Sequence, residues 1–170
     1  AGSLAVPGEA DCRPIMPCGE GTWGEIPVDG ATLYVDAAAD PGGDGSATQP
    51  YASIGAAVFV APPGALVAIA AGSYAETVLI QGKPLRLWGV CPAEVEIVVT
   101  GSSSNVCPPS ALCILDGAVG SEVHGVALRG SGNGLLLDGS EQVVVDRVWV
   151  HENATVGIQA KITQATTSLT

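Results

Sequence analysis

The segment Ile114-Leu115-Asp116-Gly117 recurs as Leu136-Leu137-Asp138-Gly139, at an offset of 22 residues. At the same offset three further apolar positions coincide: Val123 with Val145, Val126 with Val148, and Leu128 with Val150. Within each copy the apolar residues alternate with other residues, which is the pattern of short strands with one buried face. A strand-and-turn repeat of about 20–25 residues is typical of a solenoid. We therefore interpret each copy as one rung of a parallel β-helix.

A third copy follows after one inserted residue. Gly134 and Gly157 match at an offset of 23, which aligns Ile158 with Leu135 and Ala160 with Leu137. Turns accommodate such insertions, because only the strand residues contribute to the shared core. Upstream, the segment 85–89 resembles the segment 126–130, so we expect an earlier rung there.

Composition and charge limit the possible partners. The chain has 170 residues, 47% of them hydrophobic, with 23 Gly but one Phe and one Met, which suits β rungs filled by small aliphatic side chains. The net charge of -11 argues against a nucleic-acid partner, because phosphate binding needs clustered Lys and Arg. It also disfavours polyanionic polysaccharides. Residues 45–75 are uncharged, but Pro62-Pro63-Gly64 interrupts them, so no membrane span is expected.

The chain divides into a tail or linker at residues 1–31 and a parallel β-helix at 32–170, with a cap at 32–64 and rungs at 65–160. Within the cap we expect a strand at 32–35, a turn-rich loop at 36–50 and a short helix at 51–61 that is ended by Pro62-Pro63. Such a helix would cover the open apolar end of the solenoid.

The other end of the predicted solenoid has no such cover. Residues 102–110 are predicted to form a projecting loop, and nothing after residue 160 has apolar periodicity. We therefore expect this end to continue into further rungs of a longer parent chain. The alternatives are end-to-end association with another copy and strand addition from a partner.

Five cysteines indicate an oxidising compartment, and hence a secreted, periplasmic or cell-surface location. Cys12 and Cys18 flank a short Pro-containing loop and are predicted to pair. Cys113 aligns with Leu135 and is predicted to be a buried thiol, which leaves Cys91 and Cys107 as the second bridge. The main alternative is a bridge between Cys107 and Cys113.

The N-terminal half carries a family resemblance. The segments that carry it are Leu33-Tyr34-Val35-Asp36, Gln49-Pro50-Tyr51-Ala52-Ser53-Ile54 with Ala56-Ala57, Pro63-Gly64, and Ala71-Gly72-Ser73-Tyr74 with Glu76 and Val78. Over residues 32–160 the chain resembles secreted right-handed parallel β-helix proteins of the pectin-lyase-like superfamily, and its later segments resemble bacterial cell-surface members. The resemblance implies a right-handed solenoid with an N-terminal capping helix. It does not fix the chemistry, because the superfamily includes lyases, hydrolases, epimerases and adhesins.

Outward-facing residues of a β-helix form columns along the rungs, about 4.8 Å apart. The alignment predicts Trp88, Arg129 and His151 in one outward column, and Arg86, Ala127 and Trp149 in the next. Trp faces with cations between them can stack a sugar ring and bind its hydroxyls, so Trp88, Arg129, Trp149 and His151 are candidate glycan ligands. The simpler interpretation, which we favour, is that these residues only cover a sheet face.

Two pairs of carboxylates are candidates for other chemistry. Asp116 and Asp138 are predicted one rung apart, where they could act as acid and base in glycoside cleavage or bind Ca²⁺. Each precedes a Gly, so a turn role is favoured. Asp40 and Asp44, in the Gly-rich loop, are weaker Ca²⁺ candidates, and no other cofactor is expected. His124 is isolated and is predicted to be structural, whereas Asn153-Ala154-Thr155 has the form of a glycosylation sequon.

Two functions remain open on this sequence. The first is a secreted or cell-surface β-helix that serves as a binding or structural module for a polysaccharide or cell-surface glycan. The second is the N-terminal part of a polysaccharide lyase or glycoside hydrolase. The absence of a convincing catalytic set favours the first.

Overall fold

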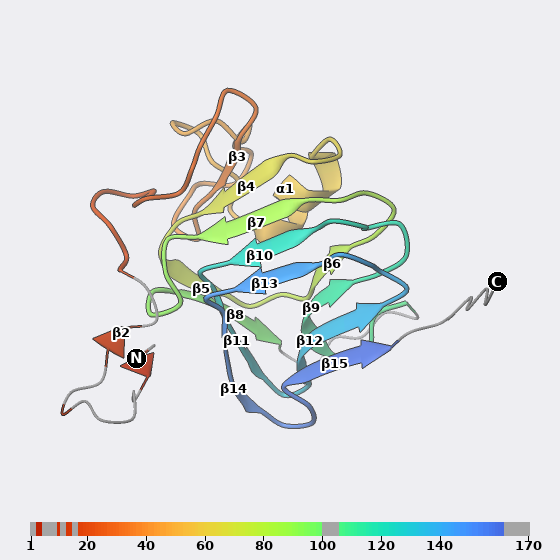
Figure 1. The fold of residues 1–170 in the computed structure, drawn as a ribbon. Helices are drawn as coiled ribbons and strands as arrows, with labels where there is room; N and C mark the ends of the chain where they lie inside the picture. The colour runs from red at the N-terminus through yellow and green to blue at the C-terminus, as the bar shows by residue number, and fades with distance from the viewer. Residues whose placement is uncertain (1–2, 5–9, 11–12, 15–16, 100–105, 162–170) are drawn as a thin grey trace.

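The computed structural model describes residues 3–4, 10, 13–14, 17–99 and 106–161 of the chain. After β3 (Leu33–Val35) and helix α1 (Ile54–Val60), the described strands follow one another in four turns of three (Figure 1). The first two turns are β4 (Leu66–Ile69), β5 (Gly72–Tyr74), β6 (Val78–Ile80), β7 (Arg86–Gly89), β8 (Val95–Val99) and β9 (Ser110–Ile114). The next two are β10 (Glu122–His124), β11 (Ala127–Gly130), β12 (Asn133–Asp138), β13 (Val144–Asp146), β14 (Trp149–Asn153) and β15 (Ile158–Lys161).

Equivalent strands of successive turns pair in parallel and make three sheets. We call them the first sheet (order β13-β10-β7-β4-β3), the second sheet (β14-β11-β8-β5) and the third sheet (β15-β12-β9-β6). A separate antiparallel pair joins β1 (Ser3–Leu4) to β2 (Arg13–Pro14). The mainly β, parallel fold predicted from the repeat is confirmed, and its arrangement is that of a parallel β-solenoid.

The core lies between the three sheets and is filled by alternate residues of the strands up to β12, whereas β13 and most of β15 are exposed. In the first sheet Val67, Leu87 and Val123 occupy successive places in one inward column, and all three are fully buried. Leu112 and Leu135 do the same in the third sheet. Burial of such side chains contributes about 1.5–3 kcal/mol each relative to exposure, so these columns are the main source of stability.

The predicted register is correct for most of the repeat. Val123 pairs with Val145, Leu128 with Val150, and Leu135 with Ile158. The register predicted for the segment 114–117 against the segment 136–139, however, is wrong by one residue. Ile114 pairs with Leu137, not with Leu136. The turn after β9 is therefore one residue longer than the turn after β12, and a slip of one residue moves a side chain to the other face of its sheet.

This slip places Cys113 on the outer face of the third sheet, next to Leu136 rather than Leu135. There Cys113 is fully buried, as predicted, but it forms a disulfide with Cys107, so the predicted free thiol is wrong and the alternative bridge is the one that forms. The two cysteines belong to a small apolar cluster outside the main core, together with Leu115, Leu136 and Leu79.

The second disulfide joins Cys18 to Cys91. The predicted pairs Cys12–Cys18 and Cys91–Cys107 are therefore wrong. Sequence proximity favoured a local bridge at Cys18, but the segment before β3 runs back to the turn after β7 and brings Cys18 within 4.8 Å of Cys91, measured between Cα atoms. Cys12 lies outside the described residues, as do residues 102–105 of the loop predicted at 102–110.

Helix α1 is shorter than the predicted 51–61, and its buried residues Ile54, Ala57 and Val58 face the solenoid. It packs against β3, β4 and β6. In the described part of the chain, no helix is long and apolar enough to cross a membrane.

Both ends of α1 are held by side chains of the first turn. The two carboxylate oxygens of Glu76 accept hydrogen bonds from the backbone N–H groups of Ile54 and Gly55, each at 2.8 Å. At the other end, the ammonium group of Lys83 donates to the carbonyls of Phe59, at 3.2 Å, and Ala61, at 2.5 Å. These charges complement the helix dipole and satisfy backbone groups that the helix leaves unpaired.

Candidate functional site

The four predicted glycan ligands do not lie on one sheet. Trp88 lies on β7 in the first sheet, whereas Arg129, Trp149 and His151 lie on β11 and β14 in the second sheet. The alignment of segments 85–89 and 126–130 was wrong, because Leu87 pairs with Val123 and not with Leu128. The strand that follows β7 in the second sheet, β8, is the true neighbour of β11.

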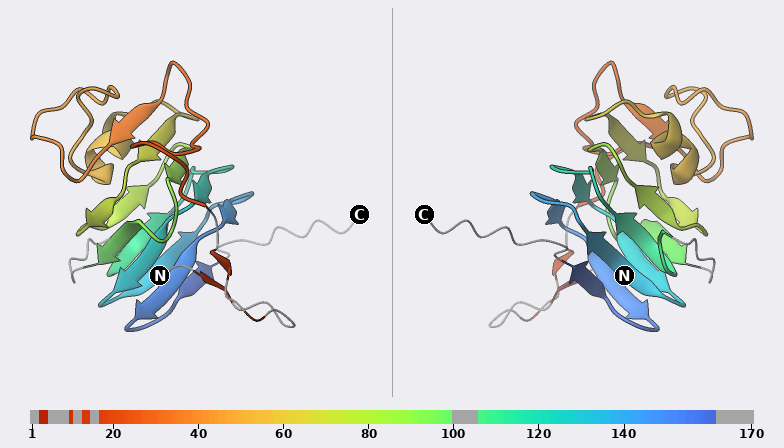
Figure 2. Two further views of the ribbon diagram at one scale, coloured as in Figure 1. Left: turned by 90° about the vertical axis from the view of Figure 1, so that its left-hand side faces the viewer. Right: turned by 90° about the vertical axis from the view of Figure 1, so that its right-hand side faces the viewer.

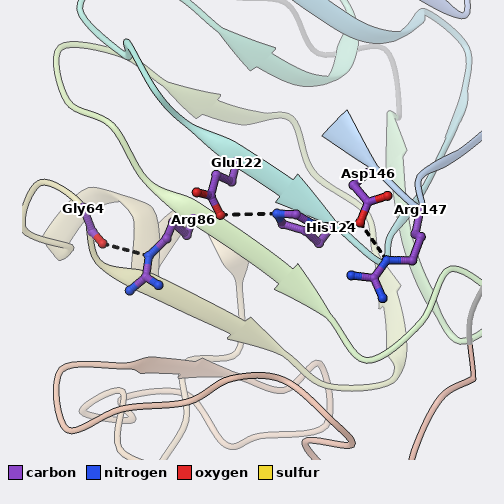
Figure 3. Close-up of polar contacts among 6 residues, drawn as sticks. All are labelled: Gly64, Arg86, Glu122, His124, Asp146 and Arg147. Atoms are coloured by element: carbon purple, nitrogen blue, oxygen red, sulfur yellow. Dashed lines mark hydrogen bonds and ion pairs between the residues drawn. The ribbon is translucent and has the colours of Figure 1, made fainter. Parts of the chain in front are cut away.

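On the outer face of the first sheet, Trp88 stacks on His124, with ring centroids 4.1 Å apart. The two nitrogens of the buried His124 ring face carboxylates: Nδ1 lies 3.4 Å from Asp146 and Nε2 lies 3.3 Å from Glu122 (Figure 3). The guanidinium carbon of Arg147 lies 5.7 Å from the Trp88 ring centroid. His124, which the sequence presented as isolated, is therefore the centre of a network that joins three turns.

Asp146 is the most connected acid of this network. Partial burial alone would raise its pKa. Hydrogen bonds and positive charge from Arg147, whose Nε donates at 2.7 Å, and from His124 outweigh that effect and hold the pKa of Asp146 below its ordinary value. Arg86, on the same face, donates to the carbonyl of Gly64 at 3.2 Å (Figure 3). The charged groups of this face pair with one another, and one face of Trp88 is covered by His124. The Trp88 indole Nε1 is buried and has no hydrogen-bond partner among the described residues. Little on this face is left to recognise a ligand.

The outer face of the second sheet brings together the other three predicted ligands. Trp149 stacks on His151 at 3.7 Å between ring centroids. Arg129 donates from Nε and Nη2 to the two carboxylate oxygens of Glu96. These hydrogen bonds and the charge of Arg129 lower the pKa of Glu96. Here too the cation is already paired and one Trp face is covered by a histidine, so this face is better explained as a packed outer layer.

The predicted carboxylate pair is not formed in register. Asp138 pairs with Lys161 along the third sheet, and its carboxylate lies 3.9 Å from the Lys161 ammonium group. Asp116 is exposed in the turn after β9, and Gly117 and Gly139 both have positive φ, at 79° and 65°. Both Asp-Gly pairs therefore mark turns, as the favoured interpretation expected.

The predicted Ca²⁺ ligands Asp40 and Asp44 also lack a site around them. Asp44 accepts a hydrogen bond from the backbone N–H of Ser46, which lowers its pKa. Among the described residues, the one group of three potential donor side chains contains Cys18, Cys91 and Glu94, and its two sulfurs are bonded to each other. Since Ca²⁺ takes six to eight oxygen ligands, these residues do not fit the ion.

The sequon asparagine is turned inward. The side-chain amide of Asn153 donates to the carbonyls of Leu128, at 3.1 Å, and His151, at 3.0 Å. These bonds engage Nδ2, the side-chain nitrogen to which an N-linked glycan would be attached.

A groove of about 590 Å³ lies instead at the β3 end of the solenoid, between the segment before β3 and the loop 36–50. We call it the loop groove. The loop that forms it lies at the end opposite β13–β15 (Figure 2). Its walls carry one indole, two carboxylates, one amide and two hydroxyl groups, from Trp23, Asp36, Asp40, Gln49, Thr22 and Thr48. Among these thirteen lining residues there is no Lys, Arg or His.

Backbone hydrogen bonds hold the loop 36–50 in place. Tyr34 donates to the carbonyl of Gly45 and receives a bond from Tyr51, both at 2.9 Å. The hydroxyl of Tyr74 accepts a bond from the Ala37 N–H at 3.2 Å and donates to the Ala70 carbonyl at 2.9 Å. Burial raises the pKa of this hydroxyl. The groove wall is thus fixed to β3 and β5.

Trp23 is placed by its packing. Its ring meets that of Tyr34 edge-on, at 4.7 Å between centroids. Sequence reasoning identified Asp40 but missed the groove, because its walls come from two segments that share no motif. The available signals were a Trp in the tail and a turn-rich loop with several acids.

No protein-family model, curated protein or solved structure matches the chain. Its function is therefore inferred from the geometry of the loop groove and the outer sheet faces.

Proposed function

We propose that this protein is a secreted or cell-surface β-solenoid module that binds a glycan in the loop groove. The observation that carries the proposal is the groove itself, whose polar walls surround one half-buried indole. Sugar sites combine an aromatic face, on which the apolar side of the ring packs, with amide, hydroxyl and carboxylate groups that bind its hydroxyls. A volume of about 590 Å³ is in the range of small-molecule sites.

The location outside the cell is supported by the two disulfides, which persist in oxidising compartments. Membership of the pectin-lyase-like superfamily is part of the same proposal. It includes a right-handed solenoid, the hand that parallel crossover connections almost always take, and a capping role for α1. The buried face of α1 against β3, β4 and β6 supports that role. The Asp116–Asp138 pair no longer supports the enzymatic alternative, which would depend on catalytic residues in further rungs.

A panel of neutral oligosaccharides tested by calorimetry or glycan array checks the proposal. We expect Trp23→Ala to weaken binding about tenfold, since a stacked aromatic contributes about 1–1.5 kcal/mol, and Trp23→Phe to retain most of it. Trp149→Ala, on the second sheet, is the matched control and should bind as the wild type does. Binding lost in Trp149→Ala and retained in Trp23→Ala would place the site on the second sheet and overturn the proposal.

A further inference from the structure

We propose that the ligand of the loop groove is a saccharide that carries a protonated amine, such as a hexosamine without its acetyl group. This inference rests on the proposed function, since it names the class of glycan that the same groove takes. Its basis is the balance of charge in the groove.

Asp36 and Asp40 both line the groove, and none of the other residues that line it is a cation. Asp36 uses Oδ1 to accept a hydrogen bond from the Ala38 N–H at 2.8 Å, which fixes the orientation of its carboxylate. The other carboxylate oxygen, Oδ2, is left to contact a ligand. Asp40 is exposed and takes part in no hydrogen bond or ion pair among the described residues. Two carboxylates are therefore presented to whatever occupies the groove.

Five basic side chains, those whose burial and contacts the structure describes, are engaged elsewhere. Each is held by a partner outside the groove: Lys83 by the end of α1, Arg86 by Gly64 and Asp29, Arg129 by Glu96, Arg147 by Asp146, and Lys161 by Asp138. The chain has a net charge of -11, and none of these five side chains lies in the groove, so we expect a negative potential there.

This charge selects among glycans. An acidic sugar would be repelled by both carboxylates, and a neutral sugar would leave them without a charged partner. An ammonium group on the ring would meet them directly, while the hydroxyls of the same ring meet Gln49, Thr48 and Thr22 and its apolar face packs on Trp23. A lysine side chain offers the ammonium group without the ring, so the indole and hydroxyl-binding groups favour the saccharide.

The test uses two probes with the same backbone: a β-1,4-linked glucosamine tetramer and its fully N-acetylated counterpart. Calorimetry on the whole chain at mildly acidic pH, where the sugar amine is protonated, and at low ionic strength should show the amine form binding about tenfold more tightly. In the double variant Asp36→Asn/Asp40→Asn the two tetramers should bind equally, because Asn keeps the shape and the Ala38 hydrogen bond but not the charge. Asp44→Asn is the matched control, since it removes a charge from the same loop outside the groove, and should keep the preference.

Each other outcome has a distinct meaning. Equal binding of the two tetramers by the wild type, weakened for both in Trp23→Ala, overturns the charge inference and leaves the proposed function in place. A lysine tetrapeptide that binds as tightly as the amino sugar and does not respond to Trp23→Ala overturns the saccharide assignment. Failure of every saccharide to bind overturns the proposed function and the inference with it.

Discussion

Cys18 and Cys91 are separated by 73 residues in sequence and joined by a disulfide whose Cα atoms lie 4.8 Å apart. The bridge fastens the segment before β3 to the turn after β7, and that segment carries Trp23 into the wall of the loop groove. Gly24 permits the fold-back: its φ is 52°, and a Cβ there would lie 2.2 Å from the Cys18 carbonyl oxygen. The disulfide is therefore tied to the candidate site as well as to the fold.

We predict that the variant Cys18→Ala/Cys91→Ala loses about 4 kcal/mol of unfolding free energy, because a long loop closed in the unfolded chain gives a large entropic effect. The variant Cys107→Ala/Cys113→Ala should lose about 2 kcal/mol, since its sequence separation is 6 residues. Urea denaturation of the three proteins measures both losses. A larger loss from the shorter bridge would contradict this prediction. Because the Cys18–Cys91 bridge fastens the segment that carries Trp23, its removal should also weaken ligand binding, and unchanged binding would contradict that expectation.

A second prediction concerns the carboxylate that holds the start of α1. Replacing Glu76 by Gln removes the charge that faces the first N–H groups of the helix, and we expect a loss of about 1–2 kcal/mol of unfolding free energy. The matched control is Glu141→Gln. Glu141 is exposed, and its backbone carbonyl, which the substitution does not change, accepts a hydrogen bond from the Gly120 N–H. Denaturation of both variants is the measurement, and equal stability of the two would show that the Glu76 contacts contribute nothing.

The pH dependence of stability should show how much the Glu96–Arg129 ion pair stabilises the folded protein. Arg129 lowers the pKa of Glu96 in the folded protein. The stabilisation that this gives is present above the unfolded pKa of Glu, about 4.3, and is lost as the pH falls through the lower folded value. Glu96→Gln should therefore be slightly less stable than the wild type near neutral pH, and the difference should disappear in acid. A difference that grows as the pH falls would have the wrong sign. Thermal unfolding of both proteins across the acid range measures it.

The sequence predicts the strands well because each inward column repeats the same apolar residue type, as Val67, Leu87 and Val123 show. It predicts the outer faces poorly because turn lengths vary independently of the strands. The slip at Ile114 reversed the face of Cys113. The alignment of segments 85–89 and 126–130 matched strands of different sheets, so Trp88 and Arg129 lie on different faces. The loop groove was missed for a further reason: its walls meet through Cys18–Cys91 and the packing of Trp23, which no local pattern records.

The last prediction compares two residues of one column. Leu135 and Ile158 are paired on β12 and β15, but Leu135 is fully buried whereas Ile158, in the terminal described turn, is 52% exposed. Leu135→Ala should cost about 2–5 kcal/mol because it leaves a cavity. Ile158→Ala should cost less than about 1 kcal/mol, since little of its surface is removed from water. If the end turn instead packs against another copy of the chain, Ile158→Ala will cost as much as Leu135→Ala, and the unfolding midpoint of the wild type will rise with protein concentration. Denaturation of both variants at two protein concentrations separates a free solenoid end from an associated one.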